Sequence, residues 1–181
     1  MEVNFKANFI NKTSIQKYNS ATGSFLPHAV SFVELSNKNL IDRWVLKKTS
    51  RLWKNSYAYD MYKNQRKNKD LRFFAITEQD TNFEVLEAKK ILGLSQVMNI
   101  DVGVYNVDYL QTNPQYTVNM TNRKYKKIGT TMLDNLKNVF HYNTLKLTSL
   151  YDVIDFYLNN NFRFENFYLS DLVWCKEFDK D

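Results

Sequence analysis

The chain has 181 residues, of which 44% are hydrophobic and 15% aromatic. This composition excludes a disordered or fibrous protein and suits one domain with a sizeable core. The net charge of +6 and the pI of about 9.2 favour an anionic partner, such as a nucleic acid, an anionic cofactor or an acidic surface. No apolar run is long enough to span a membrane, and residues 1–10 lack the apolar stretch of a signal peptide, so we expect a cytoplasmic protein.

One cysteine and two histidines limit the thiol and metal chemistry of the chain. An internal disulfide is excluded, and His28, His141 and Cys175 lie far apart in the sequence, so we expect no metal site. The apolar run LVWCKEF around Cys175 favours a structural cysteine in a terminal strand over a nucleophile.

Residues 1–40 predict an N-terminal extension of strand and loop. VNFKANFI (3–10) alternates as a strand does, residues 19–27 carry the glycine and proline of a loop, and HAVSFVEL (28–35) predicts a second strand. From Leu40, apolar residues recur at helical spacing through a basic segment, and the pattern breaks into two helices near Trp53 to Ala58. This region is basic, and it is either a solvated helix face or a surface for an anionic partner.

After residue 70 the spacing of the apolar residues changes from that of a helix to that of a strand. Three runs predict the strands of an antiparallel meander, which Pro114 ends: LRFFAIT (71–77), KILGLSQVMNI (90–100) and VGVYNVDYLQT (102–112). Apolar residues then recur at the spacing of a helix from Ile128 to Phe140, before a short strand at 144–150.

The last segment predicts a second helix and a hairpin. Ser149 and Asp152 form a capping box for a helix over 151–160, and residues 162–169 and 171–178 have the pattern of two strands. The whole order predicts a mixed α/β (α+β) fold in a single domain over residues 1–181.

The stretch NRKYKKIGTTML (122–133) places a basic loop immediately before a helix. The first N–H groups of a helix have no partner within it and attract anions, and Gly129 allows a ligand to approach the backbone closely. Further donors are the hydroxyls of Thr130 and Thr131 and the ammonium groups of Lys124, Lys126 and Lys127. Neither a Walker loop nor a Rossmann fingerprint is present. From these residues alone, an anion site and a plain amphipathic helix both remain open.

Tyr157 lies within DFYLNNNF, in the second predicted helix. It is either an amphipathic core tyrosine or a phenol that gives its proton to a departing thiolate. A phenol pKa near 10 and a thiol pKa of about 8.5 make the second role feasible.

The element order and these motifs together resemble the GNAT superfamily of N-acetyltransferases over residues 71–178. The family's loop pattern Q/R-x-x-G-x-G/A corresponds to residues 124–129, where a lysine opens the motif and Lys127 replaces the inner glycine. The family's strand L-x-V-x-P corresponds to residues 110–114, with a longer spacing to the loop.

The family's F-Y-x-x-x-G-F ending corresponds to residues 156–162. Asn161 replaces its glycine, and asparagine is the next best residue for a left-handed turn. The family often has an asparagine at the position that is Leu150 here.

The resemblance implies a central, mostly antiparallel twisted sheet flanked by helices. This sheet would be splayed between the strand ending near Thr112 and the strand from Leu145 to Leu150. The donor would be acetyl-CoA, with its pantetheine arm along the backbone of Leu110, Gln111 and Thr112. Its pyrophosphate would lie on the loop formed by Lys124, Tyr125, Lys126, Lys127, Ile128, Gly129, Thr130 and Thr131.

The resemblance also implies direct attack of a primary amine on the thioester, with Tyr157 as general acid to the CoA thiolate. An alkylamine arrives protonated and needs a base; Asp108 is one candidate, and Glu84 and Glu87 are others. The sequence does not identify the acceptor.

The alternative is a GNAT-like module of weak or lost activity that binds nucleic acid or protein through its basic surface, as the changes at Lys127 and Leu150 suggest. A nucleic acid is the less favoured partner. A dimer paired through the terminal hairpin fits the pattern without being required by it.

Overall fold

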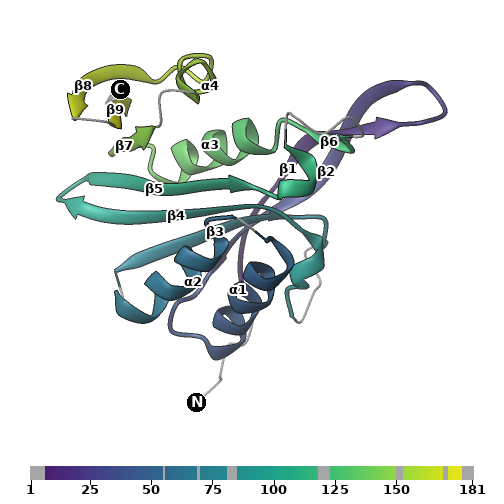
Figure 1. Cartoon of the computed structure of the whole chain (residues 1–181), viewed down its shortest axis with the longest axis horizontal. Coiled ribbons are helices and arrows are strands. Elements are labelled where there is room, and N and C mark those ends of the chain that lie inside the picture. The colour runs from purple at the N-terminus through teal and green to yellow at the C-terminus, as the bar shows by residue number, and fades with distance from the viewer. Residues whose placement is uncertain are drawn as a thin grey trace.

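A single sheet with helices on both of its faces makes up the computed structural model. The structure describes residues 7–54, 56–68, 70–80, 85–117, 123–149, 153–168 and 171–176. The strand order of the sheet is β6-β1-β2-β3-β4-β5-β7-β9-β8, and all neighbours among the described strands are antiparallel except the pair β5–β7 (Figure 1). The strands are β1 (Asn8–Asn19), β2 (Ser24–Leu35), β3 (Leu71–Thr77), β4 (Ile91–Asp101), β5 (Val104–Thr112), β6 (Tyr125–Lys126), β7 (Thr144–Ser149), β8 (Arg163–Tyr168) and β9 (Asp171–Lys176). The helices are α1 (Leu40–Leu52), α2 (Ala58–Lys67), α3 (Ile128–Val139) and α4 (Ile154–Leu158), with short 3₁₀ turns η1 (Ala88–Lys90) and η2 (Pro114–Tyr116).

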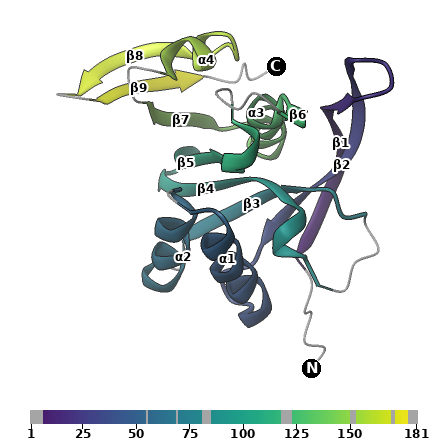
Figure 2. The same cartoon turned by 45° about the vertical axis from the view of Figure 1, so that its right-hand side comes forward.

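A long β1–β2 hairpin projects from the body of the molecule (Figures 1 and 2). The prediction of a loop over residues 19–27 is wrong for its second half, because β2 begins at Ser24 and pairs with β1 up to Asn19. Pro27 is tolerated in this strand because the pairing of β2 with β3 starts only at Ser31, which leaves Pro27 with a neighbour on one side. Residues 3–6 of the first predicted strand lie outside the described residues.

The α1 and α2 helices cover one face of the sheet (Figure 2). The predicted break between them is confirmed, since α1 ends at Leu52 and α2 begins at Ala58. Asn39 caps α1 by accepting a hydrogen bond from the N–H of Ile41. Val45, Leu46 and Met61 from these helices are fully buried in one core with apolar residues of β2, β3 and β4.

The α3 helix covers the opposite face (Figures 1 and 2). Its apolar stripe is confirmed, because Ile128, Met132, Leu133 and Leu136 are buried in a second core beside the sheet. The three strands of the meander also lie where they were predicted, within one or two residues at each end. No helix in the described part of the chain combines the length and hydropathy needed to cross a membrane.

The α4 helix is shorter than predicted, with five residues in place of a helix over 151–160. It ends because Asn161 adopts a left-handed conformation, with φ of 60°, and the N–H of Phe162 turns back to the carbonyl of Tyr157 at 3.1 Å. Val153 occupies the N-cap without a side-chain bond, and Asp152 of the predicted capping box lies outside the described residues. The terminal hairpin is confirmed as β8 and β9, and Cys175 lies in β9 opposite Lys146 of β7.

Candidate active site

The predicted splay of the sheet is confirmed at β5 and β7. Their parallel pairing runs only from Val104 and Thr144 to Val107 and Leu147, and the strands part beyond that point. Asp108 is an extra residue in β5, because Gln96 of β4 lies opposite Tyr109 while the next residue of β4 lies opposite Val107. Such a bulge bends a strand and ends its pairing. Residues 109–112 therefore pair with β4 alone and present their other edge to the opening between the strands.

The bulge places Asp108 on the face of the sheet covered by α1 and α2. Its carboxylate accepts hydrogen bonds from the Gln96 amide at 2.8 Å and from the Asn106 amide at 2.6 Å. The Gln96 carbonyl oxygen in turn accepts from Asn64 of α2 at 3.4 Å. This network orients the carboxylate and uses one hydrogen bond on each oxygen, which leaves further lone pairs for a proton or a water molecule.

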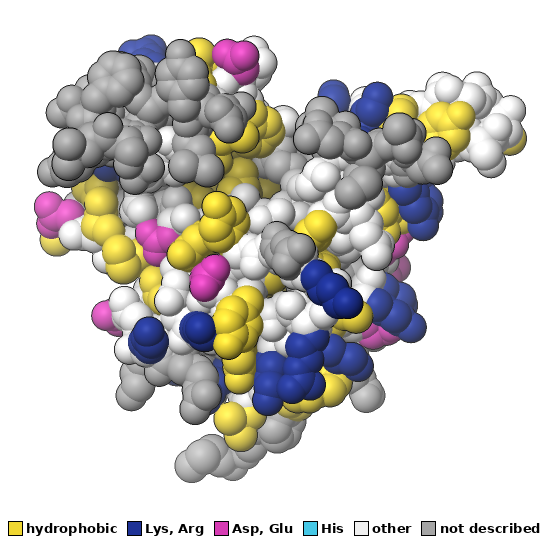
Figure 3. Space-filling view, viewed as in Figure 1, with side chains coloured by type: hydrophobic (Ala, Val, Ile, Leu, Met, Phe, Trp, Pro, Cys, Tyr) yellow, Lys and Arg dark blue, Asp and Glu magenta, His cyan; other side chains and the backbone are white. Residues whose placement is uncertain are grey.

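Aromatic and acidic side chains surround the bulge on this face. The rings of Tyr57 and Tyr109 lie 5.2 Å apart. Burial and the negative charges of Asp60 and Asp108 raise the pKa of Tyr109. Within the described part of the chain, neither carboxylate forms an ion pair with a Lys or Arg side chain. Figure 3, in the view of Figure 1, shows acidic side chains beside hydrophobic ones left of the middle of the molecule, whereas basic side chains gather at the lower right.

On the opposite face, α3 begins with a left-handed residue. Lys127 has φ of 64° and ψ of 14°, so it keeps the conformation that a glycine normally supplies at this position. The first hydrogen bond at the start of the helix runs from the N–H of Thr131 to the carbonyl of Lys127 at 2.9 Å. The N–H groups of Ile128, Gly129 and Thr130 precede that bond and have no partner within the helix.

Gly129 brings α4 into close contact with the start of α3. A Cβ atom at Gly129 would lie 2.9 Å from the ring of Phe156, closer than real Cβ contacts allow. The ring of Phe156 contacts that of Tyr157, with centroids 5.0 Å apart. Glycine at this position therefore lets the helix that carries Tyr157 pack beside the predicted phosphate loop.

Tyr157 is half-buried against the same core as α3. Burial raises its pKa to about 12, so the phenol is protonated at neutral pH. Its ring meets Phe162 edge-on at 6.0 Å, and no hydrogen bond to its hydroxyl is found among the described residues. Lys137 of α3 fixes the end of α4 by donating a hydrogen bond to the Asn160 carbonyl at 2.8 Å.

Several residues predicted to bind the cofactor use their side chains inside the protein. The Thr131 hydroxyl donates to the Ser14 carbonyl at 3.0 Å, and the Tyr125 ring is fully buried. Lys126 lies over the Phe25 ring at 3.9 Å. The side chains of Lys124 and Lys127 are exposed.

On β5, Leu110, Gln111 and Thr112 are half-buried beside the opening between the strands. The alternative base Glu87 forms ion pairs with Lys89 and Lys90, and Glu84 lies outside the described residues. In the described part of the chain, no three His, Cys, Asp or Glu side chains converge as metal ligands would.

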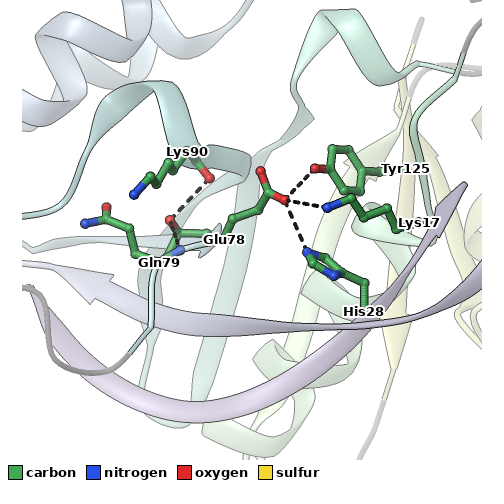
Figure 4. Close-up of polar contacts among 7 residues, drawn as sticks. Lys17, His28, Glu78, Gln79, Lys90 and Tyr125 are labelled. Atoms are coloured by element: carbon green, nitrogen blue, oxygen red, sulfur yellow. Dashed lines mark hydrogen bonds and ion pairs between the residues drawn. The ribbon is translucent and has the colours of Figure 1, made fainter. Parts of the chain in front are cut away.

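Glu78 is a residue of the site region that the sequence analysis missed (Figure 4). Its carboxylate accepts hydrogen bonds from the Tyr125 hydroxyl at 2.5 Å and from the His28 ring at 3.2 Å, and the Lys17 ammonium lies 3.6 Å away. Burial alone would raise the pKa of Glu78, but these contacts lower it. These side chains come from four separate segments, so no local sequence pattern marks the cluster.

Solved N-acetyltransferases share this architecture at low sequence identity. PaiA N-acetyltransferase from Thermoplasma acidophilum, solved with coenzyme A, is 17% identical with a TM-score of 0.56, over 83% of this chain and 100% of its own. PseH from Campylobacter jejuni, solved with acetyl coenzyme A, is 12% identical with a TM-score of 0.52, over 83% and 99%. Tetrahymena GCN5 is 11% identical with a TM-score of 0.58, over 82% and 96%. No family model and no curated protein matches the sequence. The likeness in structure shows that this chain has the fold of the GNAT N-acetyltransferases.

Proposed function

We propose that the protein transfers an acetyl group from acetyl-CoA to a primary amine by direct attack. The observation that carries this proposal is the opening between β5 and β7, which has Asp108 on one face of the sheet and the Tyr157 helix on the other. An acyl donor and an amine that enter from opposite faces would meet where the two strands part. The similar folds of proteins solved with coenzyme A or acetyl coenzyme A support this assignment.

Acetyl-CoA fits the chain's own donors as a substrate. Its pyrophosphate would accept hydrogen bonds from the N–H groups of Ile128, Gly129 and Thr130, with the Lys124 and Lys127 side chains as nearby positive charges. Lys127 preserves the required backbone in spite of its side chain, because it already has the left-handed conformation. The pantetheine arm would add as a strand to the free edge of residues 110–112.

Asp108 would take the proton of the incoming ammonium group. An alkylamine has a pKa of about 10.4 and arrives charged, so the negative charges of Asp60 and Asp108 attract it. The carboxylate, held by Gln96 and Asn106, would accept the proton directly or through water. The free amine would then attack the thioester carbonyl.

Tyr157 would assist the departure of the CoA sulfur. Its pKa of about 12 keeps the phenol protonated, so the hydroxyl donates a hydrogen bond to the sulfur as the carbon–sulfur bond breaks. Because a thiol has a pKa of about 8.5, full transfer of this proton is uphill. The raised pKa therefore favours a strong hydrogen bond to the thiolate over early protonation.

The test combines binding and turnover. Acetyl-CoA at millimolar concentration should raise the melting temperature, and thiol release should follow when a panel of amines is added. Tyr157→Phe should lower kcat by about 10²-fold or more while the shift with acetyl-CoA persists. No thermal shift of the wild type would refute the function, and intact turnover of Tyr157→Phe would refute the role of its hydroxyl.

A second candidate function rests on the exposed face of α1. Its one acidic residue, Asp42, is buried, whereas Lys48 is exposed and lies 4.7 Å from the ring of Trp44, a side chain that is 52% exposed. Cations beside an exposed aromatic ring suit the phosphates and bases of a single-stranded nucleic acid. RNA binding that weakens steeply with salt, together with no acetylation of any amine tested, would favour this function over the first.

A further inference from the structure

We infer that Glu78 is a positioning residue for the phosphate loop, acting through Tyr125. The inference rests on the proposed function, since it assigns coenzyme A to the loop that follows Tyr125. Glu78 stands directly after β3, where its N–H donates to the Lys90 carbonyl at 3.1 Å and holds its backbone in place. From this fixed point its carboxylate accepts the hydrogen bond of the Tyr125 hydroxyl (Figure 4).

The loop needs such an anchor because its backbone is held at few points. β6 consists of Tyr125 and Lys126 alone, and among the described residues it pairs with Lys17 and Gln16 of β1. One further backbone bond, from the Tyr18 N–H to the Lys124 carbonyl at 2.9 Å, extends this pairing by a residue. Two paired residues form a weak strand, so the buried side chain of Tyr125 has to supply the remaining restraint. Its ring is fully buried and meets Tyr116 edge-on at 4.8 Å, and its hydroxyl reaches Glu78.

Tyr125 lies two residues before the strained position of the loop. Lys127 has φ of 64°, a conformation that side chains other than glycine adopt at a cost. That conformation directs the N–H groups at the start of α3, which begins at the next residue. Fixing Tyr125 in the core therefore keeps Lys127 left-handed and the N–H groups oriented toward a pyrophosphate.

Charge repulsion and positioning of the loop predict opposite changes in coenzyme A affinity when the Glu78 carboxylate is removed. A carboxylate near a site for phosphate repels the ligand, so removing its charge would tighten binding if charge alone mattered. Removing the acceptor for the Tyr125 hydroxyl would loosen the loop and weaken binding. The direction of the change in coenzyme A affinity therefore distinguishes the charge effect of Glu78 from its positioning effect.

The experiment titrates the full chain with coenzyme A by calorimetry. Glu78→Leu, which removes the charge and the acceptor together, and Tyr125→Phe, which removes the donor, should each raise the Kd roughly tenfold, because the hydrogen bond to a charged group is lost in both. The double variant should bind within about twofold of the weaker single variant, because the two residues act as one unit. Asp80→Asn is the matched control: it removes one negative charge two residues further on, from an exposed side chain paired with Lys12, and should leave the Kd unchanged or slightly lower.

Kinetics separates positioning from a purely structural role. With any amine that the wild type acetylates, Tyr125→Phe should raise KM for acetyl-CoA and leave kcat within about twofold, because the loop orients the donor and does not touch the reacting atoms. A lower melting temperature with an unchanged Kd would mean that Glu78 only stabilises the fold. An unchanged or lower Kd for Glu78→Leu would overturn the inference. A wild type that binds no coenzyme A would refute the proposed function and this inference with it.

Discussion

Replacing Lys127 by glycine should stabilise the protein. Lys127 is one of two residues other than glycine that have positive φ in the described part of the chain, and it stands where the GNAT loop pattern has a glycine. A side chain in the left-handed conformation costs about 1–2 kcal/mol. Glycine removes this cost, but it also raises the conformational entropy of the unfolded chain, which destabilises the folded state by about 0.5–1 kcal/mol.

The net gain is therefore about 0.5–1 kcal/mol in the free energy of unfolding. For a chain of this size, 1 kcal/mol corresponds to a melting temperature change of about 2–4 °C. Lys126→Gly is the matched control, because it removes the same charge from the neighbouring residue in β6, where the backbone is extended. It should lower the free energy of unfolding by about 0.5–1 kcal/mol, so the two variants differ in sign.

Urea denaturation followed by fluorescence measures both changes. Lys127→Ala supplies a second control, since it removes the charge and keeps the strained backbone, and it should leave stability close to that of the wild type. If Lys127→Gly lowers the free energy of unfolding as much as Lys126→Gly does, the left-handed position does not store strain and the reasoning fails.

Three further predictions concern other strained or buried positions. Asn161→Ala should lower the free energy of unfolding by about 1 kcal/mol, measured in urea, because alanine tolerates the left-handed end of α4 less well. Gly129→Ala should cost about 1 kcal/mol in the same assay, since overpacking against Phe156 outweighs the gain in helix propensity, and Phe156→Leu in the same chain should restore part of the loss. Burial raises the pKa of Asp42 from 3.8 to about 6, so the free energy of unfolding should fall as pH rises from about 4 to 6. Asp42→Asn should remove this pH dependence and raise the free energy of unfolding at pH 7 by up to about 3 kcal/mol.

The sign of the pH effect follows from proton binding. Between pH 4 and 6 the folded state holds the Asp42 proton that the unfolded state has lost, so raising the pH favours unfolding. A pH profile identical for the wild type and Asp42→Asn would contradict the assignment. Equal stability of Asn161→Ala and Asn161→Gly would contradict the account of the α4 end. Failure of Phe156→Leu to recover any stability would contradict the close contact at Gly129.

Local patterns of the sequence were sufficient for most of the helices and strands. The apolar stripe of α3, the division between α1 and α2 and the three strands of the meander follow from spacing within a few neighbouring residues, and all are confirmed. The same patterns mispredicted the structure where one residue type is compatible with two local structures. Pro27 signals a loop but is also allowed at an unpaired strand edge, and the asparagines after Leu158 continue a helical pattern although Asn161 ends it.

The sequence by itself determined where a basic loop precedes a helix, and which two positions had lost their glycine. Only the tertiary structure decided that both positions remain left-handed, that Asp108 lies in a bulge on the face of α1 and α2, and that Tyr157 packs against the core of α3. It also brought Glu78 to Tyr125, a residue 47 positions away. The physical reason is that helical and strand periods arise from neighbouring residues, whereas bulges, close packing at a glycine and buried hydrogen bonds depend on partners that folding brings together.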